Sequence, residues 1–205
     1  MIAACLTVLA KAPVAGMAKT RLIPALGADG AARLAARLLD HTMAEAAATG
    51  FAHLRLLGSP DAQHPALARH AGVAALGSQC EGDLGARMLL ALRDGLASQP
   101  ASLIIGTDAP ALDRHRLREA ALVLEANDAV VVPALDGGYA LLGLSARAGT
   151  VPELLFSGMT WSTATVMAET RQRLQRLGLR WVELDAVSDI DEAADLAHLP
   201  AGWLA

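Results

Sequence analysis

The chain has 205 residues, of which 54% are hydrophobic and 19% charged, and its net charge is −4. This length predicts one domain spanning residues 1–205, and the composition is typical of a folded globular chain and excludes a disordered one. The acidic balance argues against general nucleic-acid binding, which requires a basic face, so no nucleic-acid partner is expected.

Strands and helices are predicted to alternate along the chain. In chain order the predicted elements are a strand at 2–10, helix 31–49, strand 53–58, helix 65–70, strand 73–76, helix 84–97, strand 102–106, helix 114–126, strands 129–133 and 139–144, helices 152–156 and 163–177, strand 179–184 and helix 192–198. Asp29 is the expected N-cap of the first long helix, and Gly50 its expected end. The alternation predicts an α/β fold with a largely parallel sheet flanked by helices.

Cysteine content and hydropathy indicate the compartment. Cys5 and Cys80 are too few for a disulfide framework or a cysteine-based zinc site. The N-terminus has no basic segment ahead of its apolar run, and no uninterrupted apolar run reaches about 18 residues. We therefore expect a cytoplasmic protein without a membrane span, and the sequence gives no indication of its oligomeric state.

The loop after the first strand gathers positive charge. Its sequence, KAPVAGMAKTRL, spans residues 11–22 and contains Lys11 and Lys19, the two lysines of the chain, together with Arg21. Gly16 lets a ligand approach the backbone, and ligands of open α/β sheets bind at the carboxyl ends of strands. A compact ammonium is suited to phosphate, so the loop predicts a di- or triphosphate site. The alternative is a solvated basic loop.

A carboxylate follows the predicted strand at 102–106. Asp108 lies in the run LIIGTDAP, where Pro110 prevents the sheet from continuing. Opposite a polyphosphate loop, this carboxylate is a suitable ligand for Mg²⁺ or Mn²⁺, which proteins hold with one or two carboxylates plus substrate phosphates. The alternative is an Asp that caps the following helix, and the two roles are compatible.

Two later segments are candidates for an acceptor site. In VVPALDGGY a strand ends, Asp136, Gly137 and Gly138 form a turn, and the next strand begins with Tyr139. An ordinary hairpin turn explains the same pattern, although paired glycines also let a substrate lie on the backbone. In FSGMTWST, Trp161 and Ser162 could wall an acceptor pocket; otherwise Ser162 or Thr163 caps a helix and Trp161 packs.

Two further segments carry acidic candidates. Asp189 and Asp191 point the same way if their segment is extended, so either could be a second metal ligand, and helix capping by Asp191 is the alternative. Asp83, at the start of a helix in GDLGARM, could contact a nucleobase or ribose, or cap that helix. The six histidines are scattered, and no nucleophile–base pair stands out, which favours metal-assisted transfer of a phosphorylated group over covalent catalysis.

Together these motifs resemble a known family. The elements KAPVAGMAKTRL, GDLGARM, GTDAP, PALDGGYALLGL, FSGMTWST and DIDEAADL occur in this order, from residue 11 to residue 196. They resemble the DUF2064 family of glycosyltransferase-A-fold proteins, in the nucleotide-diphospho-sugar transferase superfamily. The resemblance implies a single Rossmann-like domain with a mixed sheet, a nucleotide bound across the first loop and a divalent metal at Asp108.

The resemblance and the motifs together give an expected site. The expected nucleotide-binding residues are Lys11, Ala12, Pro13, Gly16, Lys19, Arg21, Asp83 and Arg87. Lys19 and Asp108 are expected to be catalytic, and Asp108, Asp189 and Asp191 to hold the metal. The expected acceptor-binding residues are Asp136, Gly137, Gly138, Tyr139, Trp161 and Ser162.

The chain departs from the usual pattern of the family at two places. Ala109 stands where Ser or Cys is common, which removes a polar group near the expected metal. Glu192 and Ala193 stand where Thr-Pro is common after the last acidic pair, which weakens the assignment of Asp191.

Three hypotheses follow. The first is a Mg²⁺- or Mn²⁺-dependent transferase that moves a sugar from a nucleotide-sugar to a small-molecule acceptor. The second is a nucleotidyltransferase in which an acceptor attacks the α-phosphate of GTP or another NTP, because the KTRL stretch is also similar to guanylyltransferases that activate phospholactate or phosphoenolpyruvate. The third is a nucleotide-binding module without turnover.

Overall fold

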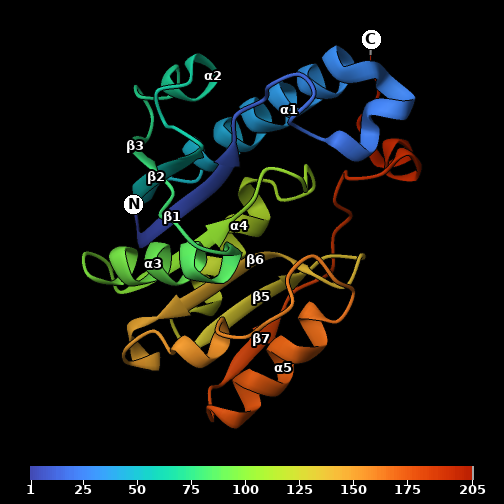
Figure 1. Cartoon of the computed structure of the whole chain (residues 1–205). Coiled ribbons are helices and arrows are strands. Elements are labelled where there is room, and N and C mark those ends of the chain that lie inside the picture. Colours follow the sequence, from blue (N-terminus) through green and yellow to red (C-terminus); the bar gives the residue numbers. More distant parts are fainter. Residues whose placement is uncertain (205) are drawn as a thin grey trace.

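Seven strands form one sheet in the computed structural model, which describes residues 1–204 (Figure 1). The strands are β1 (Ile2–Lys11), β2 (Phe51–Ser59), β3 (Ala75–Ser78), β4 (Ala101–Ile105), β5 (Ala129–Pro133), β6 (Tyr139–Ser145) and β7 (Trp181–Glu183). Their order is β3-β2-β1-β4-β6-β5-β7, and β6 alone is antiparallel to its neighbours, β4 and β5. The predicted α/β fold with a mixed, mostly parallel sheet is confirmed.

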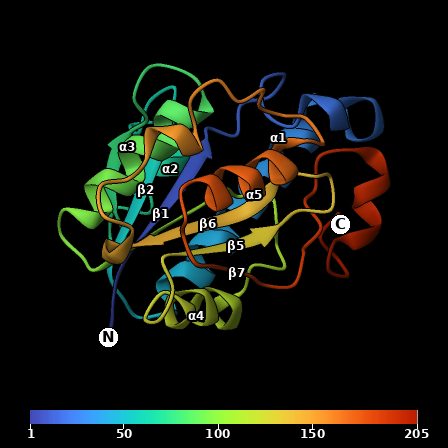
Figure 2. The same cartoon turned by 90° about the horizontal axis from the view of Figure 1, so that it is seen from below.

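Helices cover both faces of the sheet. They are α1 (Ile23–Ala47), α2 (Pro65–Ala68), α3 (Leu84–Leu96), α4 (Arg114–Val123) and α5 (Val166–Arg176), with short 3-10 helices η1 (Thr20–Leu22), η2 (Ala146–Ala148), η3 (Glu153–Leu155) and η4 (Ala193–His198). Leu39 of α1 and Leu117 of α4 pack in one core cluster with Leu6 of β1. Met88 of α3 and Leu174 of α5 pack in a second cluster on the other face, and Figure 2 shows α4 on the opposite side of the strands from α3 and α5.

The first long helix begins earlier than its periodicity predicts. It starts at Ile23 with Pro24 in its first turn, a position where a missing N–H costs nothing. Gly27, with φ 70° and ψ 165°, is not helical, so a kink separates a first helical turn before Gly27 from the long helical segment that follows it. The expected N-cap, Asp29, therefore lies inside the helix, and that prediction was wrong. Gly50, with φ 81°, follows the helix end as expected.

A third, smaller core cluster anchors the last part of the chain. Leu22 of η1 and Leu34 and Leu38 of α1 pack around Ile190, which is fully buried, and Trp203 packs against the same group. The Trp203 ring meets the ring of His41 edge to face at 5.1 Å. The C-terminal segment, red in Figure 1, is thereby held beside α1 and next to the loop that follows β1.

The remaining predicted elements are present with shifted ends. The predicted helices 152–156 and 192–198 are 3-10 helices, and the helix predicted from residue 163 begins at Val166. No helix within residues 1–204 is long and apolar enough to span a bilayer. Strands β1, β4 and β5 run in the same direction, so the loops that follow them lie together at the carboxyl ends of these strands. Strand β6, which is antiparallel, begins at the same end of the sheet.

Candidate active site

Asp108 lies just beyond the carboxyl end of β4, as the sequence predicts. All five residues of β4 are buried, and the strand delivers the chain to the sheet edge through Gly106 and Thr107. The backbone carbonyl of Asp108 accepts a hydrogen bond of 2.8 Å from the N–H of Ile190. This bond joins the loop after β4 to the acidic segment at 189–191, so two predicted metal-ligand segments lie side by side.

Lys19 connects the two segments. Its ammonium nitrogen lies 2.5 Å from Oδ1 of Asp108 and 2.8 Å from Oδ1 of Asp191, and it donates a 2.6 Å hydrogen bond to the carbonyl of Ile190. The Lys19 side chain is only 8% exposed. Its backbone has φ 47° and ψ 46°, a left-handed conformation that is uncommon for a residue with a side chain. The fold thus holds the Lys19 backbone in an uncommon conformation, and three oxygen atoms engage its ammonium.

The charge of Lys19 is favoured by its partners. Burial alone disfavours the ammonium, but the adjacent carboxylates of Asp108 and Asp191 outweigh that effect and raise the pKa of Lys19 above its usual value. Lys19 is therefore a permanent positive charge at neutral pH, surrounded by three oxygen atoms.

The same three oxygens suit a divalent cation. Two carboxylate oxygens and one carbonyl oxygen are hard ligands of the kind that Mg²⁺ and Mn²⁺ prefer. In this structure the Lys19 ammonium occupies the position between them. Within residues 1–204, no group of three or more His, Cys, Asp or Glu side chains gathers closely enough to hold a metal alone. An ion here would need ligands beyond Asp108 and Asp191, such as the Ile190 carbonyl and the phosphates of a substrate.

Asp189 faces a different neighbour from Asp191. Burial, and then the negative charge of Asp136, raise the pKa of the Asp189 carboxyl to about 6. The Asp136 carboxylate itself accepts a 2.7 Å hydrogen bond from the N–H of Gly138 in the turn between β5 and β6. Both members of the predicted acidic pair reach the same cavity, but only Asp191 shares Lys19 with Asp108.

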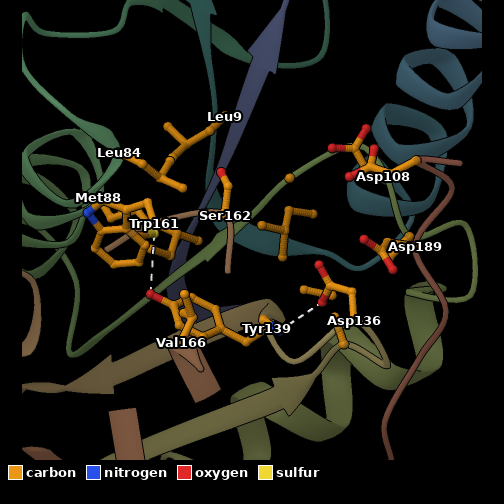
Figure 3. Close-up of a pocket in the computed structure, with 18 of the residues that line it drawn as sticks. Leu9, Leu84, Met88, Asp108, Asp136, Tyr139, Trp161, Ser162, Val166 and Asp189 are labelled. Carbon is orange, nitrogen blue, oxygen red and sulfur yellow. Dashed lines mark hydrogen bonds between the residues drawn. The ribbon is translucent and has the colours of Figure 1, made fainter. Parts of the chain in front are cut away.

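A cavity of about 320 Å³ opens in front of these carboxylates. Figure 3 shows its two ends, with Asp108, Asp136 and Asp189 on one side and Leu84, Met88, Tyr139 and Trp161 on the other. The cavity also contains Gly138 and Ser162, so most of the predicted acceptor residues lie around it. Gly137 supports the wall from behind, because its carbonyl accepts a 2.8 Å hydrogen bond from the N–H of Met167 in α5.

The predicted nucleotide loop is not gathered around Asp108. The exposed Lys11 donates a 2.8 Å hydrogen bond to the carbonyl of Met17 and lines a separate cavity with the buried Ala12 and with His64. Arg21 is 62% exposed and lies 3.8 Å from Glu192. The loop turns at Gly16, where φ is 78°, and Pro13 is half-buried. Of its three basic side chains, Lys19 alone reaches the carboxylates.

The start of α3 forms a second polar group near the ends of β1 and β2. Oδ1 of Asp83 accepts a 2.8 Å hydrogen bond from the N–H of Ala86, so this residue caps the helix. Arg87 donates to the side chain of Gln79, which in turn donates to the carbonyls of Ala10 and Leu57. Gln79 escaped the sequence analysis because a lone Gln in a loop carries no signal.

Two residues that line the cavity were not predicted to belong to the site. Leu84 and Met88 follow the apolar stripe of α3, and helical spacing predicts only that such residues pack in a core. Met88 does so, at 4% exposure, yet Leu84 is 42% exposed at the cavity. The spatial order of the strands, which places α3 opposite the β5–β6 turn, could not be obtained from periodicity.

The comparisons identify the family. The model of the family described as "Uncharacterized protein conserved in bacteria (DUF2064)" matches residues 42–163, more than half of the chain. The chain therefore belongs to the DUF2064 family. A search of functionally curated proteins found no significant match.

Solved structures place the fold among transferases. The chain is similar to a protein from Desulfovibrio desulfuricans G20, provisionally described as a nucleotide-diphospho-sugar transferase, with 26% identity, a TM-score of 0.84 and coverage of 94% of this chain and 84% of that one. A nucleotidyl transferase from Methanothermobacter thermautotroptrophicus shares the fold with 13% identity, a TM-score of 0.65 and 98% coverage of both chains.

A third structure holds a metal. It is Rv0371c from Mycobacterium tuberculosis H37Rv in complex with manganese, with 19% identity, a TM-score of 0.53 and coverage of 96% of this chain and 97% of that one. At this identity the likeness concerns the fold alone.

Proposed function

We propose that the protein is a transferase that uses Mg²⁺ or Mn²⁺ and moves a sugar from a nucleotide-diphospho-sugar to a small-molecule acceptor. The observation that carries the proposal is the set of three oxygens around the Lys19 ammonium at the sheet edge, opening into a cavity large enough for a small substrate. The likeness to the Desulfovibrio protein supports the same class of reaction.

Asp108, Asp191 and the Ile190 carbonyl would hold the ion. When bound there, a divalent ion supplies positive charge that stabilises the departing nucleoside diphosphate. An ion and the Lys19 ammonium cannot occupy the same place between two carboxylates that each lie within 2.8 Å of the ammonium nitrogen. Lys19 would therefore release both carboxylates as the ion binds, and its charge would pair with a phosphate of the donor instead.

The acceptor would lie in the cavity, beside Asp136 and Tyr139. Its nucleophilic group attacks the anomeric carbon of the donor sugar, the bond from that carbon to the diphosphate oxygen breaks, and the nucleoside diphosphate leaves with the electron pair. Cavity walls from α3 and the segment before α5 would restrict access of water to the sugar.

Nucleotidyl transfer is the second candidate, because the fold is shared with a nucleotidyl transfer enzyme over nearly the whole chain. The same cation-binding oxygens would then act on departing pyrophosphate. The cavity walls favour the first candidate, because in the described residues they contain no lysine, arginine or histidine to receive a phosphorylated acceptor.

A ligand screen followed by product analysis tests the proposal. Nucleotides and nucleotide-sugars are first ranked by thermal shift with and without Mn²⁺, because ligands that bind the folded state raise its stability. The proposal expects one nucleotide-sugar to stabilise the protein in a Mn²⁺-dependent way and to yield a nucleoside diphosphate. Preference for an NTP with release of pyrophosphate would establish the second candidate. Binding that ignores Mn²⁺ and gives no product would indicate a binding module.

A pair of variants gives the control. Asp108→Asn is expected to abolish the Mn²⁺-dependent part of the stabilisation and of the turnover. Asp94→Asn removes a carboxylate that pairs with Arg55 on the surface and is expected to change neither. Equal Mn²⁺ dependence in Asp108→Asn and the unmodified protein would overturn the assignment of the ion to this site.

A further inference from the structure

The two ends of the cavity differ sharply in chemistry. One end presents the carboxyl groups of Asp108, Asp136, Asp189 and Asp191. The other end is formed by apolar surfaces of Leu84, Met88, Tyr139 and Trp161 (Figure 3). A ligand that fills the cavity must therefore match a negatively charged region and an apolar region within one small molecule.

The acidic end has little positive charge to offset it. Lys19 is fully engaged by Asp108, Asp191 and the Ile190 carbonyl, and a divalent ion would replace it at the same oxygens. Among the ion pairs of residues 1–204, none includes Asp136 or Asp189. Arg21 lines the adjoining cavity with these two residues, but its side chain is 62% exposed and screened by water.

At the apolar end, the polar atoms of the two aromatic side chains are either engaged or buried. The Tyr139 hydroxyl donates a hydrogen bond to Sδ of Met88, and the indole N–H of Trp161 is buried without a partner. Trp161 lies directly on Gly85 of α3, where a Cβ would come within 2.8 Å of the indole. The absence of a side chain at Gly85 thus leaves room for the edge of the indole that carries Cζ2 and Nε1 to pack against the helix.

We infer that the acceptor is a compact molecule with an apolar body and a hydroxyl or amino group, which binds as a neutral alcohol or as an ammonium, rather than a phosphate or a carboxylate. The apolar body lies against Met88 and Trp161, and the hydroxyl or amino group lies among the carboxylates. In the transfer, the nucleophile is the hydroxyl oxygen, or the amine nitrogen once its ammonium form has lost a proton. It attacks the anomeric carbon, the O–H or N–H proton passes to a carboxylate of the acidic end, and the nucleoside diphosphate departs with the electron pair of the broken bond. The inference rests on the proposed function, because it names the acceptor of that reaction.

Three probes of matched size test whether the cavity prefers a neutral or cationic group over an anionic one. Benzylamine, benzyl alcohol and benzoate share a phenyl ring, and a cavity of about 150 Å³ is already enough for benzene, so all three fit in about 320 Å³. Their dissociation constants are measured by ligand-observed NMR titration without donor or metal. We expect benzylamine and benzyl alcohol to bind at least about tenfold more tightly than benzoate. Partly dehydrated carboxylates repel the negative charge of benzoate, whereas they attract the ammonium of benzylamine and do not repel the neutral hydroxyl of benzyl alcohol.

Variants locate the binding and its charge preference. Trp161→Ala is expected to weaken all three probes, whereas Trp203→Ala, which removes a tryptophan that packs against α1, is expected to leave them unchanged. Asp136→Asn is expected to keep benzyl alcohol binding and to reduce the advantage of benzylamine. Thermal denaturation of each variant checks that it folds.

The contrary outcomes are distinct. The inference would be overturned if benzoate bound as tightly as benzylamine. It would also be overturned if Trp161→Ala left the binding of all three probes unchanged. Because the probes are measured without a nucleotide, their result is independent of the donor screen. If a nucleotide-sugar binds in a Mn²⁺-dependent way but the three probes bind equally well, the inference about the acceptor is wrong and the proposed function stands. If the probes differ as expected but no nucleotide-sugar binds, the proposed transferase function is wrong and the charge preference of the cavity stands.

Discussion

At the scale of single residues, the two lysines show what a sequence can and cannot reveal. Lys11 and Lys19 lie in one predicted loop, and the sequence treats both as phosphate ligands. Their places differ because the left-handed backbone at Lys19 directs its side chain toward Asp108, while Lys11 stays at the surface on the Met17 carbonyl. The partner Asp191 is 172 positions from Lys19, a contact that only the folded chain can create.

Lys19→Met is expected to tighten Mn²⁺ binding. The substitution removes the ammonium that occupies the space between Asp108 and Asp191, so an ion no longer has to displace it. We expect the dissociation constant for Mn²⁺ to fall about tenfold, which corresponds to about 1.4 kcal/mol, while affinity for a nucleoside diphosphate falls. Titration of free Mn²⁺ by electron paramagnetic resonance measures the first effect. Lys11→Met is the matched control, and an unchanged affinity in Lys19→Met would contradict the competition.

Asp189 is expected to make stability depend on pH. Its pKa of about 6 in the folded protein lies above its ordinary value of 3.8, so the folded state binds the proton more tightly than the unfolded state. The resulting stabilisation is complete below about pH 4, declines between pH 4 and 6, and is absent above pH 6. Thermal unfolding across this range should therefore show Asp189→Asn gaining stability relative to the unmodified protein as the pH rises. Parallel pH profiles for the two proteins would refute the shift.

At the scale of elements, strand positions were predictable and the spatial order of the strands was not. Most strands are mainly apolar runs, and β4 and β5 are fully buried, which is the pattern of strands covered on both faces. The insertion of the antiparallel β6 between β4 and β5 depends on pairing between distant segments, which periodicity does not contain. The early start of α1 was missed because Pro24, Gly27 and Gly30 together look like a loop.

The turn between β5 and β6 illustrates why one position demands glycine. Gly137 has φ 93°, and a Cβ there would lie 2.2 Å from the carbonyl oxygen of Ala164, just before α5. Gly137→Ala is therefore expected to destabilise the protein by about 2–4 kcal/mol, from backbone strain and steric overlap together. Chemical denaturation measures the loss. Gly16→Ala, at φ 78° with open space around it, should lose about 1 kcal/mol, and similar losses for both variants would contradict the packing argument.

At the scale of the whole molecule, the continuous sheet predicts a single cooperative unit. Hydrogen bonds run without interruption from β3 at one edge to β7 at the other, and helices pack on both faces. Trp181 lies in the edge strand β7, whereas Trp203 lies against α1. In variants that keep only one of these tryptophans, fluorescence-detected urea unfolding should have the same midpoint for both. Two separated transitions would show that the chain contains two domains.

The burial of Lys19 also has a consequence for the chemical reactivity of the chain. Besides the α-amino group, the protein has two amines, and one of them is enclosed while the other is at the surface. Acylating reagents should therefore label Lys11 readily and spare Lys19, whose nitrogen is protonated and only 8% of whose side chain is exposed. Since Lys11 is a built-in reference, the ratio of the two labels read by mass spectrometry would report how often the Lys19 amine leaves its carboxylates.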